Sequence, residues 1–68
     1  MIKEYDVVRL KTDALAGTVP LATEGTILVV LSRSPGAFLV EFMSTENISL
    51  GIFTLSEGDL ELVRSSEE

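Results

Sequence analysis

The sequence predicts an all-β domain in which five short strands curl into a small barrel around one core. Segments rich in β-branched and aromatic residues alternate with clusters of Gly, Pro, Ser, Asn and Asp, a pattern typical of strands and turns. The chain has 68 residues, which gives room for one core only. It contains no Cys and no His, so packing has to stabilise that core without disulfides or the best zinc ligands.

The predicted strands are the five segments that combine high β-propensity with flanking turn residues. They are Val7–Leu10, Gly25–Leu31, Ala37–Met43, Ile48–Leu55 and Leu60–Val63. Residues 11–24, between the first two strands, are too many for a tight turn and too irregular for a helix. We therefore expect a folded-over loop there, anchored on the core by Leu15, Val19 and Leu21.

The second strand is apolar at every position from Ile27 to Leu31, whereas a strand with one solvated face alternates. Its outer face is therefore expected to be covered by a loop, by the other half of a barrel, or by another chain. Closure into a barrel is the simplest of these three explanations.

The sequence Arg33-Ser34-Pro35-Gly36 predicts a hairpin between the second and third strands. Pro35 fixes φ near about −65°, and Gly36 can adopt the positive φ of a type II turn. In the third strand Phe38, Val40 and Phe42 recur with period two. We expect these side chains to face the core, and a ligand-binding platform is the alternative for the two phenylalanines.

A polar cluster, Ser44–Asn47, is expected to close the next hairpin. Ile48, Leu50 and Ile52 then form the expected core-facing set of the fourth strand. Gly51 interrupts that strand and indicates a bulge or sharp bend, with close approach of a ligand backbone as the alternative.

One 3₁₀ turn is predicted over residues 56–59, with Ser56 placed to cap it. The domain is expected to span residues 1–64, and residues 65–68 are expected to form a disordered acidic tail.

This order of strand, long loop, three-strand meander, 3₁₀ turn and final strand is the layout of SH3-like barrels. From Tyr5 to Val63 the chain also resembles a family of short, uncharacterised bacterial proteins that is frequent in cyanobacteria. The resemblance is carried by Val7-Val8-Arg9-Leu10, Gly25-Thr26-Ile27, Pro35-Gly36-Ala37-Phe38-Leu39-Val40-Glu41-Phe42, Thr54-Leu55 and Asp59-Leu60-Glu61-Leu62-Val63. It implies an SH3-like fold, and that family has no established activity to transfer.

More distantly, Glu24-Gly25-Thr26-Ile27 is similar to the start of the second strand in KOW domains and in small barrel subunits of photosynthetic complexes. In those proteins the glycine serves the backbone, so the similarity implies fold rather than function.

The net charge disfavours some classes of partner. Eleven acidic and five basic side chains give a formal net charge of −6, which opposes binding to nucleic-acid phosphates and anionic lipids. The acidic residues either keep an apolar-rich domain in solution or attract a basic partner. No apolar run approaches the roughly 20 residues of a membrane span, and residues 1–6 lack the apolar stretch of a secretory signal, so a cytoplasmic location is expected.

No catalytic, cofactor-binding or metal-ligating residue is predicted. Without His or Cys, a carboxylate or Lys would have to serve as base or nucleophile. Glu57, Asp59 and Glu61 could pair as acid and base or as a weak cation site, but solvated surface is the simpler interpretation, and their spacing is not that of a calcium loop. One Tyr and no Trp argue against a polyproline-peptide reader.

Three hypotheses of function remain. The first is a non-enzymatic interaction module that docks on a larger protein partner through an exposed edge strand or the 11–24 loop, with a homo-oligomer left open. The second is an antitoxin or immunity protein that neutralises a neighbouring effector. The third is a KOW-like nucleic-acid binder, which the charge disfavours and which requires Lys3, Arg9, Lys11 and Arg33 to converge on one face.

Overall fold

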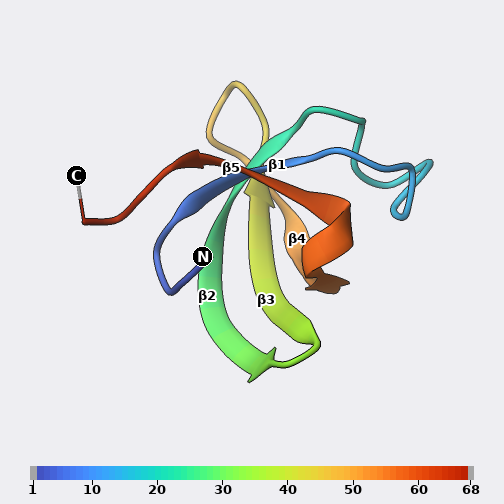
Figure 1. Ribbon diagram of the computed structural model, residues 1–68. Coiled ribbons are helices and arrows are strands. Elements are labelled where there is room, and N and C mark those ends of the chain that lie inside the picture. Colours follow the sequence, from blue (N-terminus) through green and yellow to red (C-terminus); the bar gives the residue numbers. More distant parts are fainter. Residues whose placement is uncertain (1, 68) are drawn as a thin grey trace.

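The computed structural model describes residues 2–67 and confirms the all-β class (Figure 1). Its elements are β1 (Val7–Leu10), β2 (Glu24–Arg33), β3 (Gly36–Met43), β4 (Ser49–Ser56), the 3₁₀ turn η1 (Glu57–Asp59) and β5 (Leu60–Arg64). All five predicted strands are present, and each end lies within about two residues of its predicted position, which is normal scatter for strand boundaries. In residues 2–67 no helix is long and apolar enough to cross a membrane.

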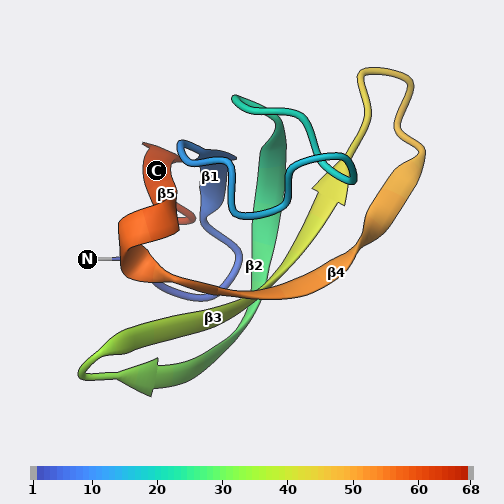
Figure 2. The same ribbon diagram turned by 90° about the vertical axis from the view of Figure 1, so that its right-hand side faces the viewer.

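The strands form one antiparallel sheet in the order β4-β3-β2-β1-β5. Within residues 2–67 no ladder joins β4 to β5, so the sheet is open where a closed barrel was expected. β2 is shared by both halves of the sheet because Glu24 to Thr26 pair with β1, while the ladder with β3 runs from Gly25 to Arg33. Its register against β3 shifts between Ile27 and Val29 and again between Val30 and Ser32. Such bulges bend a strand, and in Figure 2 β2 and β3 curve together away from β1.

The core lies on the concave side of this bent sheet. Its fully buried members include Val8, Leu10, Ile27, Val40 and Phe42. The prediction that Phe38, Val40 and Phe42 face inward is therefore confirmed, since each is no more than 3% exposed.

Gly25 allows the Phe42 ring to lie against β2. The two residues are directly opposite in the ladder, and Gly25 also pairs with Val8 on the other side. A Cβ at Gly25 would lie 2.8 Å from the Phe42 Cδ1 atom and 2.8 Å from the Glu41 carbonyl oxygen. The glycine at this strand start is thus required by close packing.

The prediction for the core face of β4 is wrong for Ile48 and Ile52, because a bulge changes the register, whereas Leu50 packs partly against the core as expected. Phe42 pairs with Gly51 but Met43 pairs with Ser49, which leaves Leu50 as the extra residue. Gly51 adopts φ +127°, so the bend expected at this glycine is confirmed. Beyond the bulge the inward residues are those opposite Val40 and Phe38. They are Phe53 and Leu55, whereas Ile48 and Ile52 are 59% and 53% exposed and Leu50 is half-buried.

The β2–β3 hairpin is present, but its turn differs from the predicted type II. Arg33 pairs with Gly36, so the turn consists of Ser34 and Pro35, and the peptide bond between them is cis. Gly36 lies on β3 without a positive φ. The 44–47 hairpin forms as predicted, with Asn47 at φ +63° donating its N–H to the Ser44 carbonyl oxygen.

The 11–23 loop folds over one end of the sheet and is closed by two backbone hydrogen bonds, between Ala22 N and Leu10 O and between Leu10 N and Thr23 O. Val19 is buried, and Leu15 packs partly against the core, as expected. Leu21 is 63% exposed, so its predicted role as an anchor is wrong.

Candidate functional site

The convex face of β2, β3 and β4 exposes an apolar surface. On this face Val29 of β2 lies opposite Leu39 of β3, and Leu39 lies opposite Thr54 of β4. At the next position of the same face, Glu41 of β3 lies opposite Ile52 of β4. Val29, Leu31 and Ile52 are 39%, 52% and 53% exposed, and Leu39 is half-buried. We call Val29, Leu31, Leu39 and Ile52 the outer face.

This exposure corrects the expectation that the outer side of β2 is covered. Ile27 is inside, but Val29 and Leu31 remain accessible. Within residues 2–67 neither of the two covers from the same chain is present. The long loop folds over the end of the sheet, and the sheet stays open between β4 and β5. Of the three covers suggested by the sequence, namely a loop, the other half of a barrel and another chain, these observations leave the third.

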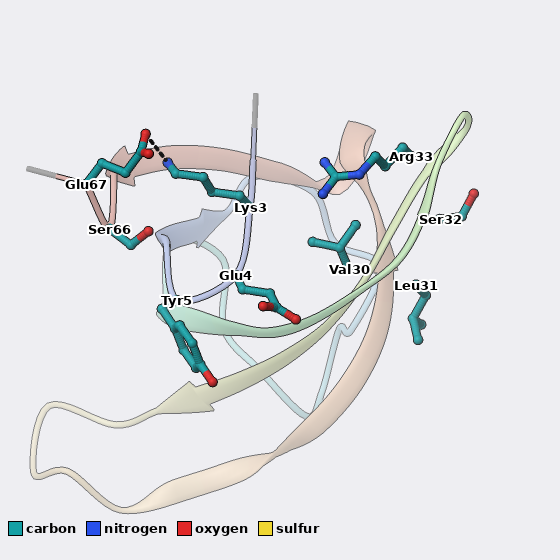
Figure 3. Close-up of a pocket in the computed structure, with 9 residues that line it drawn as sticks. All are labelled: Lys3, Glu4, Tyr5, Val30, Leu31, Ser32, Arg33, Ser66 and Glu67. Atoms are coloured by element: carbon teal, nitrogen blue, oxygen red, sulfur yellow. Dashed lines mark ion pairs between the residues drawn. The ribbon is translucent and has the colours of Figure 1, made fainter.

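A cleft of about 660 Å³ lies beside the outer face, between the N-terminal turn and the far end of β2 (Figure 3). Tyr5 and Leu31 form its exposed apolar part, and Lys3, Arg33 and Glu67 also line it. Tyr5 adopts φ +68°, a conformation that is uncommon for a side chain of this size, and its N–H donates to the Ile27 carbonyl oxygen at 2.7 Å. That bond fixes the exposed tyrosine against the edge of β2.

A second, larger cleft of about 990 Å³ lies where the 11–24 loop meets the 44–47 turn. Its apolar lining includes Pro20, Leu21, Met43 and Leu50, with Arg64 at its margin. This cleft lies at one of the two places where the sequence suggested a partner surface.

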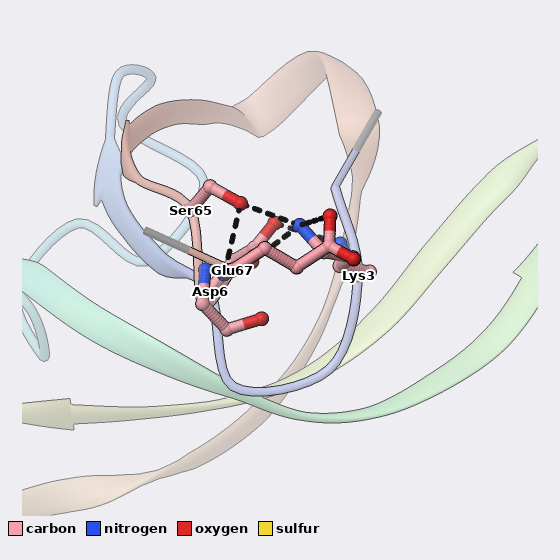
Figure 4. A network of polar contacts seen from close by, with 5 residues as sticks. Lys3, Asp6, Ser65 and Glu67 are labelled. Atoms are coloured by element: carbon pink, nitrogen blue, oxygen red, sulfur yellow. Dashed lines mark hydrogen bonds and ion pairs between the residues drawn. The ribbon is translucent and has the colours of Figure 1, made fainter.

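Among residues 2–67 the buried charged residue is Asp6, whose side chain is fully inaccessible (Figure 4). It accepts hydrogen bonds from Ser66 N at 2.7 Å, from Lys3 N at 2.9 Å and from Lys3 Nζ at 3.2 Å. Burial raises the pKa of the Asp6 carboxyl, but the hydrogen bonds from Ser66 and Lys3 outweigh it, so the pKa lies below its ordinary value. All its acceptor contacts are internal, so Asp6 holds the two chain ends together.

The same cluster includes residues of the acidic tail, whose expected disorder stays a prediction. The Lys3 ammonium donates to Ser65 Oγ at 2.6 Å and lies 3.6 Å from a Glu67 carboxylate oxygen. These contacts bring residues 65–67 back onto the N-terminal turn, and Glu68 lies outside the described residues.

Asp59 and Glu61, two of the carboxylates considered as an acid–base pair or a cation site, contact different partners. Asp59 accepts hydrogen bonds from Thr12 Oγ1 at 2.8 Å and Ser56 Oγ at 2.9 Å, which hold the pKa of its carboxyl below the ordinary value. Ser56 occupies the N-cap position, as expected. Glu61 pairs with Arg9 at 3.2 Å. Among residues 2–67 no group of three or more carboxylates is placed to hold a metal ion.

The cations required for nucleic-acid binding do not gather into one patch. Lys3 and Arg33 line the cleft beside Tyr5, whereas Arg9 on β1 lies between Glu24 at 3.9 Å and Glu61. Lys11 donates its backbone N–H to the Asp59 carbonyl oxygen next to η1. Two of the four residues are therefore close together and two are elsewhere.

Sequence reasoning missed the exposed residues Tyr5, Ile48 and Ile52 as candidate contacts. Ile48 and Ile52 carried no signal, because the bulge that turns them outward changes the phase of an otherwise regular apolar pattern. A lone tyrosine next to an acidic residue likewise has no pattern that indicates exposure.

Comparisons of the whole chain with protein-family models, with curated proteins and with solved structures gave no match, so the outer face and the two clefts are described from their own geometry.

Proposed function

We propose that this protein is a non-enzymatic interaction module that docks on a larger protein through the outer face of its open sheet. One observation carries the proposal: Val29 and Leu31 on β2 and Ile52 on β4 are exposed on the same face of the sheet, with half-buried Leu39 on β3 between the two strands. Contiguous apolar surface on a small domain is typical of a protein–protein contact, whereas scattered apolar residues are not. Tyr5, which lines the same cleft as Leu31, adds an exposed aromatic side chain of the kind enriched at interface centres.

The proposal includes an SH3-like fold. Its support is the element order, with a long loop after β1, a β2-β3-β4 meander and η1 before β5, together with a sheet in which β1 lies between β2 and β5. The resemblance to short bacterial barrel proteins stays a prediction, as does the cytoplasmic location.

The experiment uses the wild-type protein and matched variants as baits. It compares how much partner protein each bait captures from an extract of the organism that encodes the chain. Val29→Thr combined with Ile52→Thr replaces two exposed apolar side chains with polar ones while keeping β-branching and β-propensity. A partner captured by the wild type should be reduced about tenfold or more by this pair, which corresponds to the loss of two ordinary interface contacts. Val63→Thr, an equally conservative change on exposed β5, should leave capture unchanged. Equal capture by all three proteins would contradict the proposal.

The neutralising antitoxin or immunity protein is a special case of this proposal in which the partner is a basic effector. A neighbouring gene whose toxicity the protein relieves would support it. The KOW-like nucleic-acid binder has less support, because the ion pairs of Arg9 and Lys3 use charges that phosphates would require.

A further inference from the structure

The two edges of the open sheet differ in how they are protected. Edge strands normally carry charged side chains or proline, which discourage pairing with other chains. β5 carries Glu61 and Arg64, but β4 has no charged residue and no proline over its eight residues. Gly51 twists the first part of β4 through its bulge, and from Ile52 to Ser56 the ladder with β3 is regular.

The outward side of this regular segment has no partner within residues 2–67. In an antiparallel ladder every second residue directs its N–H and C=O away from the neighbouring strand. β4 pairs only with β3, and no described backbone hydrogen bond joins Ile52–Leu55 to any other segment. Ile52 and Thr54 are exposed on one face, and half-buried Phe53 faces the other. An incoming strand would therefore find free main-chain groups next to apolar side chains.

Acidic residues flank this edge. Glu41 pairs with Ile52 in the β3–β4 ladder, whereas Glu61 lies on the opposite edge strand β5, where it pairs with Arg9, and is no part of this charge. Glu46 precedes β4 and Glu57 follows it directly, so an acidic residue stands at each end of the uncharged strand.

We propose that β4 is a docking edge for an extended, basic segment of a partner protein, which adds to the sheet as a sixth strand with alternating apolar residues and with Lys or Arg at both ends. This inference rests on the proposed function and names the partner class. Main-chain hydrogen bonds give such strand addition its affinity, and side-chain pairing gives its selectivity. A second copy fits poorly, because antiparallel pairing of two uncharged β4 strands brings Glu46 before one strand close to Glu57 after the other.

The test uses three capped synthetic peptides and NMR at low ionic strength. KKVTVTVKK has the proposed pattern, EEVTVTVEE reverses its charge, and KKVTPTVKK removes the central N–H donor. The first should shift the amide signals of Ile52–Leu55 and slow their hydrogen exchange. The other two should each bind about tenfold or more weakly, since one loses charge complementarity and the other loses strand pairing.

Charge variants at an exposed position of β4 provide an independent arm. Thr54→Lys should weaken the binding of KKVTVTVKK about threefold, and Thr54→Glu should strengthen it by a similar factor, as expected for single surface charge pairs. Leu62→Lys on the opposite edge is the control and should have no effect. Opposite responses of two variants at one site cannot come from loss of folding.

Four results would overturn the proposal: equal binding of the basic and acidic peptides, no binding of any peptide, perturbation centred on either cleft, or a β4–β4 dimer of the free protein. None of these would refute the interaction module itself, which depends on the separate comparison of outer-face variants.

Discussion

Replacing Asp6 with Asn tests whether the polar cluster at the chain ends stabilises the domain. The carboxylate accepts three hydrogen bonds, from Ser66 N, Lys3 N and Lys3 Nζ, and both of its oxygens are used. An Asn amide has the same shape, but its NH₂ group would face a donor at one of the two positions. A buried donor left without an acceptor costs about 1–3 kcal/mol. For a domain of this size, about 2 kcal/mol lowers the unfolding temperature by roughly 8–16 °C.

The effect should depend on pH with a definite sign. The pKa of the Asp6 carboxyl is lower in the folded state than its ordinary value of 3.8, so the folded state favours the ionised form. The stabilisation is therefore fully present above the unfolded-state pKa and is lost as the pH falls through the folded-state pKa. The difference in unfolding temperature between wild type and Asp6→Asn, called the gap below, should be constant near neutral pH and should shrink below about pH 4.

Thermal unfolding followed by circular dichroism across this pH range measures the gap directly. Asp13→Asn is the matched control, because Asp13 is exposed and its side chain makes no described hydrogen bond. Asp13→Asn should unfold close to wild type at every pH. An Asp6→Asn protein that unfolds at the wild-type temperature at neutral pH, or a gap that persists undiminished at pH 2, would refute the role assigned to Asp6.

Further predictions concern the glycines, the 3₁₀ turn and the outer face. Gly25→Ala and Gly51→Ala should each destabilise the domain by about 1–3 kcal/mol in urea unfolding, because the added Cβ would lie within 3.0 Å of the Phe42 or Phe53 ring. Gly58→Ala is the control and should not destabilise it, because no atom lies within 4 Å of the added Cβ. Asp59→Asn should cost about 1 kcal/mol by weakening the hydrogen bonds to Thr12 and Ser56, and an unchanged urea midpoint would show that this cluster is unimportant. Ile52→Thr should leave stability within about 0.5 kcal/mol, since Ile52 is exposed, and a larger loss would place it in the core.

The elements of the fold were predictable from local chemistry. Strand positions follow from β-branched and aromatic segments between turn residues, and the period-two pattern of Phe38, Val40 and Phe42 gave the buried face of β3. The face of β4 was not predictable, because one extra residue, Leu50 next to Gly51, changes which side chains point inward. The glycine indicated that a bulge would occur but not on which side of it the phase would change.

The candidate surfaces were predictable only in part. An apolar second strand indicated that something must cover it, but only the sheet order shows that the chain itself does not close over Val29 and Leu31. The Asp6 cluster joins residues that are 60 positions apart, and no spacing in a single sequence reports such a contact. Free edges likewise follow from topology rather than from composition.

Native-state amide hydrogen exchange across β4 tests the open edge most directly. If β4 is an unpaired edge, amides bonded to β3 and amides directed outward should alternate between Ile52 and Leu55, with protection differing by at least about a hundredfold between neighbours. Uniformly slow exchange along this segment in the free, monomeric protein would show that the edge is already covered and would contradict both the open sheet and the docking of a partner strand.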